Sequence, residues 1–131
     1  WLLLIILSDL LQTLSHYAIH HKYFGMAMYN SHQIHHEKKS PQPDDAFYTG
    51  VLDAMVQLIL PILATVGVVA PNRTTLLLFG LAYSQWLLYI HSHTRALLPD
   101  NIFVSPDYHR MHHSKPLSHY SSVFIMWDYI L

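Results

Sequence analysis

Residues 51–90, VLDAMVQLILPILATVGVVAPNRTTLLLFGLAYSQWLLYI, are the stretch that decides the fold. The run 51–70 holds about twenty mostly apolar residues, which is enough for an α-helix to cross the roughly 30 Å core of a bilayer. Ala70-Pro71-Asn72-Arg73 favours a turn. Residues 74–90 are a second apolar run, a little short for a span on its own. Together the two runs predict a transmembrane helical hairpin.

Three residues interrupt the first run of this hairpin. Pro61 cannot donate a backbone hydrogen bond, so we expect a kink there. Asp53 and Gln57 lie near the start of the run, close to the membrane surface. A polar loop, residues 37–45 (EKKSPQPDD), precedes the hairpin and leads the chain back to the membrane.

The composition fits a membrane protein. Hydrophobic residues make up 52% of the 131 residues and charged residues only 11%, so we expect an all-α integral membrane helical bundle. A net charge of -1 argues against nucleic acid binding. The chain has no cysteine, which excludes disulfides, thiolate ligands and iron–sulfur clusters.

The chain opens on a further apolar segment, residues 1–14, that lacks the basic start and cleavage site of a signal peptide. Because it begins on Trp1 and is already apolar, we expect a single domain over residues 1–131 that is a fragment of a longer chain. Upstream transmembrane helices and the extreme C-terminus would lie outside it.

Three short histidine clusters flank the apolar runs. On a helix, residues three and four apart share a face, so the repeated pattern H-x-x-H-H turns three imidazoles toward one point. One histidine alone is more often a core or surface residue than a ligand, but packing gives no reason to repeat this spacing. With twelve histidines available, the sequence predicts a site for two metal ions. The clusters are His16 and His20; His32, His35 and His36; and His109, His112 and His113.

The hairpin returns the chain to the side that it left, so all three clusters are expected on one side of the membrane. Six of the seven basic residues lie on that side and only Arg73 lies at the far turn, which by the positive-inside rule makes the histidine side cytoplasmic. This would be the endoplasmic reticulum in a eukaryote or the inner membrane in a bacterium.

Spacing alone leaves the metal open among zinc, copper, nickel and iron. Zinc would favour hydrolysis or a structural role, whereas iron would favour oxygen chemistry. A bilayer location favours iron, because lipid substrates offer unactivated C–H bonds.

Five motifs, in order along nearly the whole chain, resemble the fatty acid hydroxylase/sterol desaturase superfamily. They are Asp9 with His16-Tyr17-Ala18-Ile19-His20, the run 32–36 (HQIHH), the run 85–92 (QWLLYIHS), the run 105–113 (SPDYHRMHH), and Trp127-Asp128. Members are integral membrane di-iron oxygenases. Here Tyr17 replaces the usual arginine of the first box, and His119-Tyr120-Ser121 stands where N-Y-G is usual.

The resemblance implies a ligand set. It comprises the eight clustered histidines and the isolated His91, with His93 as a further candidate; that is His16, His20, His32, His35, His36, His91, His109, His112 and His113. His21 and His119 are expected to make local polar contacts instead.

Other polar residues receive supporting roles. Asp9 shares a helical stripe with Thr13, His16 and His20, so we expect its carboxylate to accept a hydrogen bond from a ligand imidazole and fix its tautomer. The alternative is that Asp9 caps or solvates a frayed helix. Asp107 would cap the helix of the last box or take part in catalysis. Trp127 and Tyr129 would anchor the chain at the membrane interface.

The resemblance implies a catalytic domain: an O2-dependent di-iron lipid hydroxylase or desaturase acting on C–H bonds of a sterol, fatty acyl chain or related lipid. Its cofactors would be two iron ions, with zinc in a purified form, and O2 would be the cosubstrate. Because the chain has no haem or flavin motif, a separate cytochrome b5 or ferredoxin-type electron donor is expected.

Two alternatives stay open. Acyl-lipid and acyl-CoA desaturases also place three histidine boxes around a membrane hairpin, although the isolated His91 and Trp127-Asp128 favour the hydroxylase superfamily. A membrane metal carrier or zinc-binding module would place its ligands along the crossing helices, often mixed with carboxylates.

Overall fold

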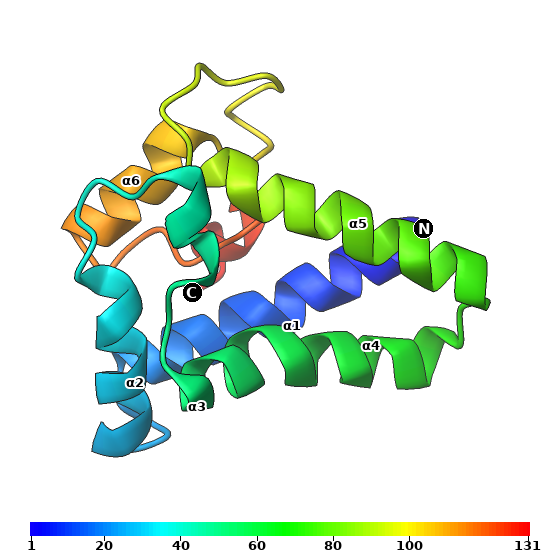
Figure 1. Cartoon of the computed structure of the whole chain (residues 1–131), viewed down its shortest axis with the longest axis horizontal. Coiled ribbons are helices and arrows are strands. Elements are labelled where there is room, and N and C mark those ends of the chain that lie inside the picture. The colour runs from blue at the N-terminus through cyan, green and yellow to red at the C-terminus, as the bar shows by residue number, and fades with distance from the viewer.

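The computed structural model describes residues 1–131 and is entirely helical apart from a single β-bridge between Phe103 and Phe124. Three long helical segments run lengthwise, and the two helices that carry the second and third histidine clusters lie together at one end (Figure 1). Two helices, Leu2–His20 and Val51–Val69, are long and apolar enough to cross a membrane. The expected all-α membrane bundle is confirmed.

Helix α1, Leu2–His20, is a single helix that carries both the opening apolar segment and the first histidine cluster. Leu2, Leu3 and Leu14 are exposed on one side, while the opposite side buries Leu4, Asp9 and the two histidines. This second side packs against α4 and the rest of the bundle. The amphipathic pattern of α1 therefore aims His16 and His20 inward.

The first hairpin helix is continuous but irregular. It consists of α3 (Val51–Asp53), a π-helical turn η2 (Ala54–Ile59) and α4 (Leu60–Val69). Pro61 has no N–H for the Gln57 carbonyl four residues earlier, and the wide π turn lies directly before it. The irregularity expected at Pro61 thus begins one turn ahead of the proline.

The predicted turn joins α4 to α5, Arg73–Ile90. Ala70 adopts a left-handed conformation with φ of 46° and ends α4, and the Asn72 side chain accepts a hydrogen bond from the Thr75 backbone N–H at 2.8 Å. Asn72 is therefore the N-cap of α5, and the return helix begins one residue earlier than expected.

The hairpin turns many large apolar side chains outward. Leu63, Leu77 and Leu81 are each more than half exposed, and Val68 is 72% exposed. Patches of this kind on a helical bundle mark contact with lipid or another apolar surface. Together with the two spanning helices, they place the chain in a membrane.

Short helices complete the histidine end of the bundle: α2 (Met26–His36), η1 (Pro43–Phe47), α6 (Pro106–Ser114) and η3 (Ile125–Tyr129). The segment 37–45 was expected to be a loop throughout, but its last residues already belong to η1, where Pro43 and Asp45 favour a helical turn. Val104, Val123 and Ile125 join α1 and α5 in the main apolar core.

Candidate metal centre

Nine buried histidines gather into two groups, within each of which the ligand atoms lie no more than 4.8 Å apart. The first group joins α1, α2 and α6, and its neighbouring Nε2 atoms are 3.0 to 3.2 Å apart. Its members are His16, His20, His32, His36 and His112. Residues far apart in the sequence therefore converge on one point.

The second group lies beside the first and joins α2, the end of α5 and α6. It consists of His35, His91, His109 and His113, with Nε2 separations of 3.0 to 3.3 Å along the series. The spacing H-x-x-H-H does not aim three imidazoles at one ion, as the sequence had suggested. Instead, each copy of the pattern is divided between the two groups.

Burial favours the neutral form of several of these imidazoles. Removal from water lowers the pKa of His91 to about 4 and that of His35 to about 3, where the neighbouring His91 adds to the effect. The pKa of His109 and that of His112 are also lowered, for the same main reason. Neutral imidazole is the form that binds a metal.

Backbone carbonyls fix which nitrogen of several rings carries the hydrogen. His35 Nδ1 lies 3.2 Å from the Tyr48 carbonyl oxygen, and His91 Nδ1 lies 2.7 Å from that of Leu87. In the first group, Nδ1 of His16 faces the Tyr120 carbonyl and Nδ1 of His112 faces that of Ser118. Because a carbonyl only accepts, each Nδ1 donates, and each neutral ring then presents an Nε2 lone pair.

These lone pairs point at one another. His35 Nε2 and His91 Nε2 are 3.3 Å apart with no hydrogen available to join them. Metal–nitrogen bonds of about 2.1 Å separate adjacent ligand atoms by about 3.0 Å at right angles and about 3.4 Å at the tetrahedral angle. The observed separations fall in this range, so the donor set fits one cation in each group.

Asp53 supports the first group, and sequence reasoning missed this role. Its Oδ1 lies 3.0 Å from His32 Nδ1, and its other oxygen accepts a hydrogen bond from the Thr49 hydroxyl. A carboxylate on Nδ1 orients an imidazole and raises its basicity as a ligand. The pair lies 21 residues apart in sequence, so no local pattern indicated it.

Asp9 does not contact an imidazole, contrary to expectation. Its carboxylate accepts hydrogen bonds from the backbone N–H groups of Ser122, Val123 and Phe124 and from Trp127 Nε1, at 2.8 to 3.3 Å. The Asp9 carboxylate is therefore bound by four donors, and none of them is a histidine. The alternative role, on a frayed helix end, is also excluded because Asp9 is fully buried.

Asp128 also binds the C-terminal segment that contacts Asp9. Its carboxylate accepts hydrogen bonds from the N–H groups of Tyr120 and Ser121 and from the Tyr108 hydroxyl. The Tyr120 carbonyl is the partner of His16, so both aspartates act on the metal centre through the backbone of residues 118–124. Trp127 is half-buried and donates from its indole Nε1 to Asp9, whereas Tyr129 is 82% exposed.

The remaining candidates lie outside both groups. His93 is exposed and its Nε2 accepts a hydrogen bond from the Gln42 amide at 2.8 Å, because the helix has already ended at Ile90. His21 contacts the Tyr120 hydroxyl and His119 contacts Ser118, as expected of local polar contacts. Asp107 does not cap α6; Ser105 does, and Asp107 pairs with Arg110.

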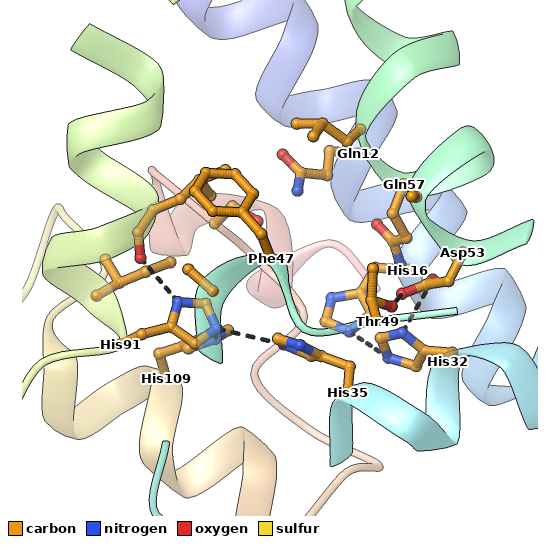
Figure 2. A pocket seen from close by; sticks show the side chains of 16 residues that line it. Gln12, His16, His32, His35, Phe47, Thr49, Asp53, Gln57, His91 and His109 are labelled. Carbon is orange, nitrogen blue, oxygen red and sulfur yellow. Dashed lines mark hydrogen bonds and ion pairs between the residues drawn. The ribbon is translucent and has the colours of Figure 1, made fainter. Parts of the chain in front are cut away.

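A cavity of about 190 Å³ opens beside both groups. Figure 2 shows His16 and His32 of the first group and His35, His91 and His109 of the second along one wall, with Gln12 and Gln57 across from them. Its apolar walls come from η1, the π turn and α5, and Asp53 and Thr49 also border it. A bound organic molecule could therefore approach both metal positions.

Comparison with known proteins agrees with this geometry. The sequence matches the fatty acid hydroxylase family over residues 1–131. The chain belongs to the fatty acid hydroxylase family. This fatty acid hydroxylase family member is also 32% identical over 105 residues to the alternative squalene epoxidase of Phaeodactylum tricornutum, an alignment that covers 75% of the chain.

That relative is much longer, since the alignment covers only 30% of its length. No solved structure matches the chain. The match to the fatty acid hydroxylase family covers all residues of both histidine groups and of the cavity.

Proposed function

We propose that the protein is an O2-dependent lipid hydroxylase or desaturase that uses two iron ions, one held by each histidine group. The observation that carries this proposal is the pair of buried imidazole groups beside one apolar cavity. Imidazole suits iron as well as zinc, and the family membership favours an oxidative reaction over a hydrolytic one. The substrate would be a sterol, a fatty acyl chain or a related lipid.

When bound, iron supplies the activation of O2 and the removal of hydrogen from a C–H bond. Hydroxylation would place one oxygen atom in the substrate and release the other as water, with two electrons and two protons consumed; desaturation would release both as water. We propose that the electrons come from a separate cytochrome b5 or ferredoxin-type donor on the cytoplasmic side.

The protein's own residues would prepare this reaction. The carbonyls of Tyr48 and Leu87 hold two rings of the second group in the tautomer that a metal requires. Asp53 does the same for His32. Leu87 and Ile90 form part of the apolar wall beside them, which would keep water from the reacting carbon.

A second reaction deserves a test because of the relative's name. Epoxidation would insert one oxygen atom into a C=C bond of an apolar lipid and would use the same metals and the same cavity. The identity to the alternative squalene epoxidase favours this possibility. The match to the fatty acid hydroxylase family disfavours the separate acyl-lipid and acyl-CoA desaturases and a metal carrier.

Lipid analysis in cells that express the complete natural protein tests the proposal. In an atmosphere of ¹⁸O2, the wild-type protein is expected to produce a lipid alcohol or epoxide that contains ¹⁸O, or a new alkene. His109→Ala should give none of these products while still inserting in the membrane, because it removes a ligand and no spanning residue. Unchanged lipids in cells whose purified protein contains iron and whose donor is co-expressed would contradict the proposal.

A further inference from the structure

Gln57 is a buried amide whose nitrogen has no hydrogen-bond partner. The residue is 8% exposed, lies in the π turn η2 and borders the cavity beside the histidines. Nearly all buried polar groups in native proteins are paired with protein, water or ligand. Because Gln57 borders the cavity, a molecule bound there is in a position to supply the missing partner.

Apart from Gln57, the buried atoms of the cavity wall that lack a hydrogen-bond partner belong to the candidate ligand His109 and to the contacting pair His32 and Asp53. The Oε1 atom of Gln12, the second amide in the wall, accepts a hydrogen bond from the Tyr83 hydroxyl. The carboxylate of Asp53 is already engaged by His32 and Thr49. Gln57 is thus a polar group available to a bound molecule, next to the apolar side chains of Ala54 and Leu58.

An apolar groove continues from the cavity toward the outside of the bundle. It lies between α4 and α5, is lined by Ile62, Leu63 and Gly80 among others, and shares Phe47 and Leu58 with the cavity. Leu63 is 59% exposed on the surface expected to face lipid. Because the two hollows share residues, a hydrocarbon tail that extends from the cavity past Gln57 would enter the groove between the two hairpin helices.

The order of polar and apolar groups along this path indicates which chemical groups a substrate would carry. Asp53, at the metal end, contacts His32; Gln57 follows one helical turn later; and the groove begins at Leu58. We propose that the substrate is a lipid with one oxygen atom, a hydroxyl or a carbonyl, that accepts a hydrogen bond from the Gln57 amide. Its hydrocarbon tail lies in the groove between α4 and α5. This inference rests on the proposed function.

Binding of two matched probes tests the role of Gln57 without turnover. The complete protein is loaded with redox-inert zinc in lipid nanodiscs, and dissociation constants are measured for hexadecan-1-ol and hexadecane. The wild-type protein should bind the alcohol about tenfold more tightly, as one added hydrogen bond predicts. Because no oxygen or electron donor is needed, this result is independent of whether the proposed oxidation occurs.

Variants then assign the preference to one residue. Gln57→Leu should abolish the preference for the alcohol and leave hexadecane binding unchanged. Gln33→Leu is the matched control, because the Gln33 amide nitrogen is also buried without a partner but the residue does not border the cavity. Equal affinity of the wild-type protein for both probes, or an equal loss for both in Gln57→Leu, would overturn the role of Gln57.

The groove is tested by filling it. A side chain at Gly80 would extend into open space, so Gly80→Leu should narrow the groove without a backbone clash and weaken both probes about tenfold, as the lost apolar contact of a few methylene groups predicts. Gly67→Leu is the control, since Gly67 has equally open surroundings and lies outside the groove. Unchanged binding of both probes in Gly80→Leu would refute the proposed path of the tail.

Discussion

Asp53 carries the clearest prediction for a single residue. Asp53→Asn would replace the carboxylate beside His32 Nδ1 with a neutral amide and so weaken the orientation of that ring. Metal affinity is expected to fall about 10- to 100-fold, as is usual when such a supporting carboxylate is lost. The measurement is the metal retained by the purified protein against a graded chelator.

The matched control is Asp107→Asn, because Asp107 is exposed and pairs only with Arg110 on its own helix. It should retain metal like the wild-type protein. Equal retention in Asp53→Asn and Asp107→Asn would show that Asp53 has no influence on the centre.

Among single residues, the sequence predicted the histidines better than the groups that contact them. Helical spacing and the family resemblance selected the same nine histidines that the structure brings together, and their service as ligands stays a prediction. Asp53 and the carbonyl of Tyr120 were missed, because they reach their imidazoles across the fold. His93 was wrongly included because α5 ends before it and leaves its ring at the surface.

Among the elements, the contact between α2 and the start of the hairpin leaves no room for a side chain at Gly50. A methyl group there would lie 2.7 Å from the Ser31 carbonyl oxygen, well inside van der Waals contact. Gly50→Ala should therefore push α2 away from α3, separate His32 from Asp53 and cost about 1–3 kcal/mol of stability. The measurements are the thermal unfolding midpoint and the metal content.

Gly67→Ala provides the control for this substitution, because the added methyl group meets no atom within 4 Å. It should not lower the midpoint. A Gly50→Ala protein as stable and as metal-rich as Gly67→Ala would show that the two helices can separate freely.

The position of the C-terminal segment depends on its hydrogen bonds to Asp9. Asp9→Asn would replace one carboxylate oxygen with an amide NH2 group, which cannot accept a hydrogen bond. Several of the four hydrogen bonds to the carboxylate would therefore be lost. Each bond to a charged group contributes about 1.5–3 kcal/mol, so a loss of about 3 kcal/mol or more is expected. Limited proteolysis should then cleave residues 118–128 more rapidly.

Trp127→Phe removes only one of these bonds and keeps an aromatic ring. Its loss of stability should be clearly smaller than that of Asp9→Asn. If the two variants were equally stable, the backbone contacts of Asp9 would contribute nothing.

The elements differed in how far they could be predicted. The hairpin and its turn followed from apolar runs and from Pro71 and Asn72, which act locally. The π turn and helix η1 were not foreseen. A proline predicts an irregular helix but not that a π turn will precede it, and the polar run 37–45 indicated a loop although Pro43 and Asp45 favour a helical turn. The course of residues 115–124 has no regular pattern at all and is fixed by distant carboxylates.

For the whole molecule, the orientation in the membrane can be tested directly. Residues 1–131 contain no cysteine, so single cysteines can be placed at exposed Ser40, on the histidine side, and at exposed Thr74, at the far turn. In a cysteine-free form of the complete protein, Ser40→Cys should react with a membrane-impermeant reagent only from the cytoplasm. Thr74→Cys should react only from the opposite side.

The positive-inside argument supports this expectation, since Arg73 is the single basic residue at the far turn. Reaction of both cysteines from the same side would contradict the hairpin as a membrane-crossing unit. Reaction from exchanged sides would leave the hairpin intact and reverse its orientation.

The attachment of the C-terminal segment also sets the order in which the protein matures. His16 and His112 receive their Nδ1 partners only from residues 118 and 120, and Asp9 receives its donors only from residues 122–127. During synthesis, a ribosome that has released the chain through His91 has exposed six of the nine histidines, and residues 118–127 have not yet been made. If each histidine group holds a metal ion, we expect tight binding only after residues 118–127 have been released and have docked on Asp9 and the histidine rings.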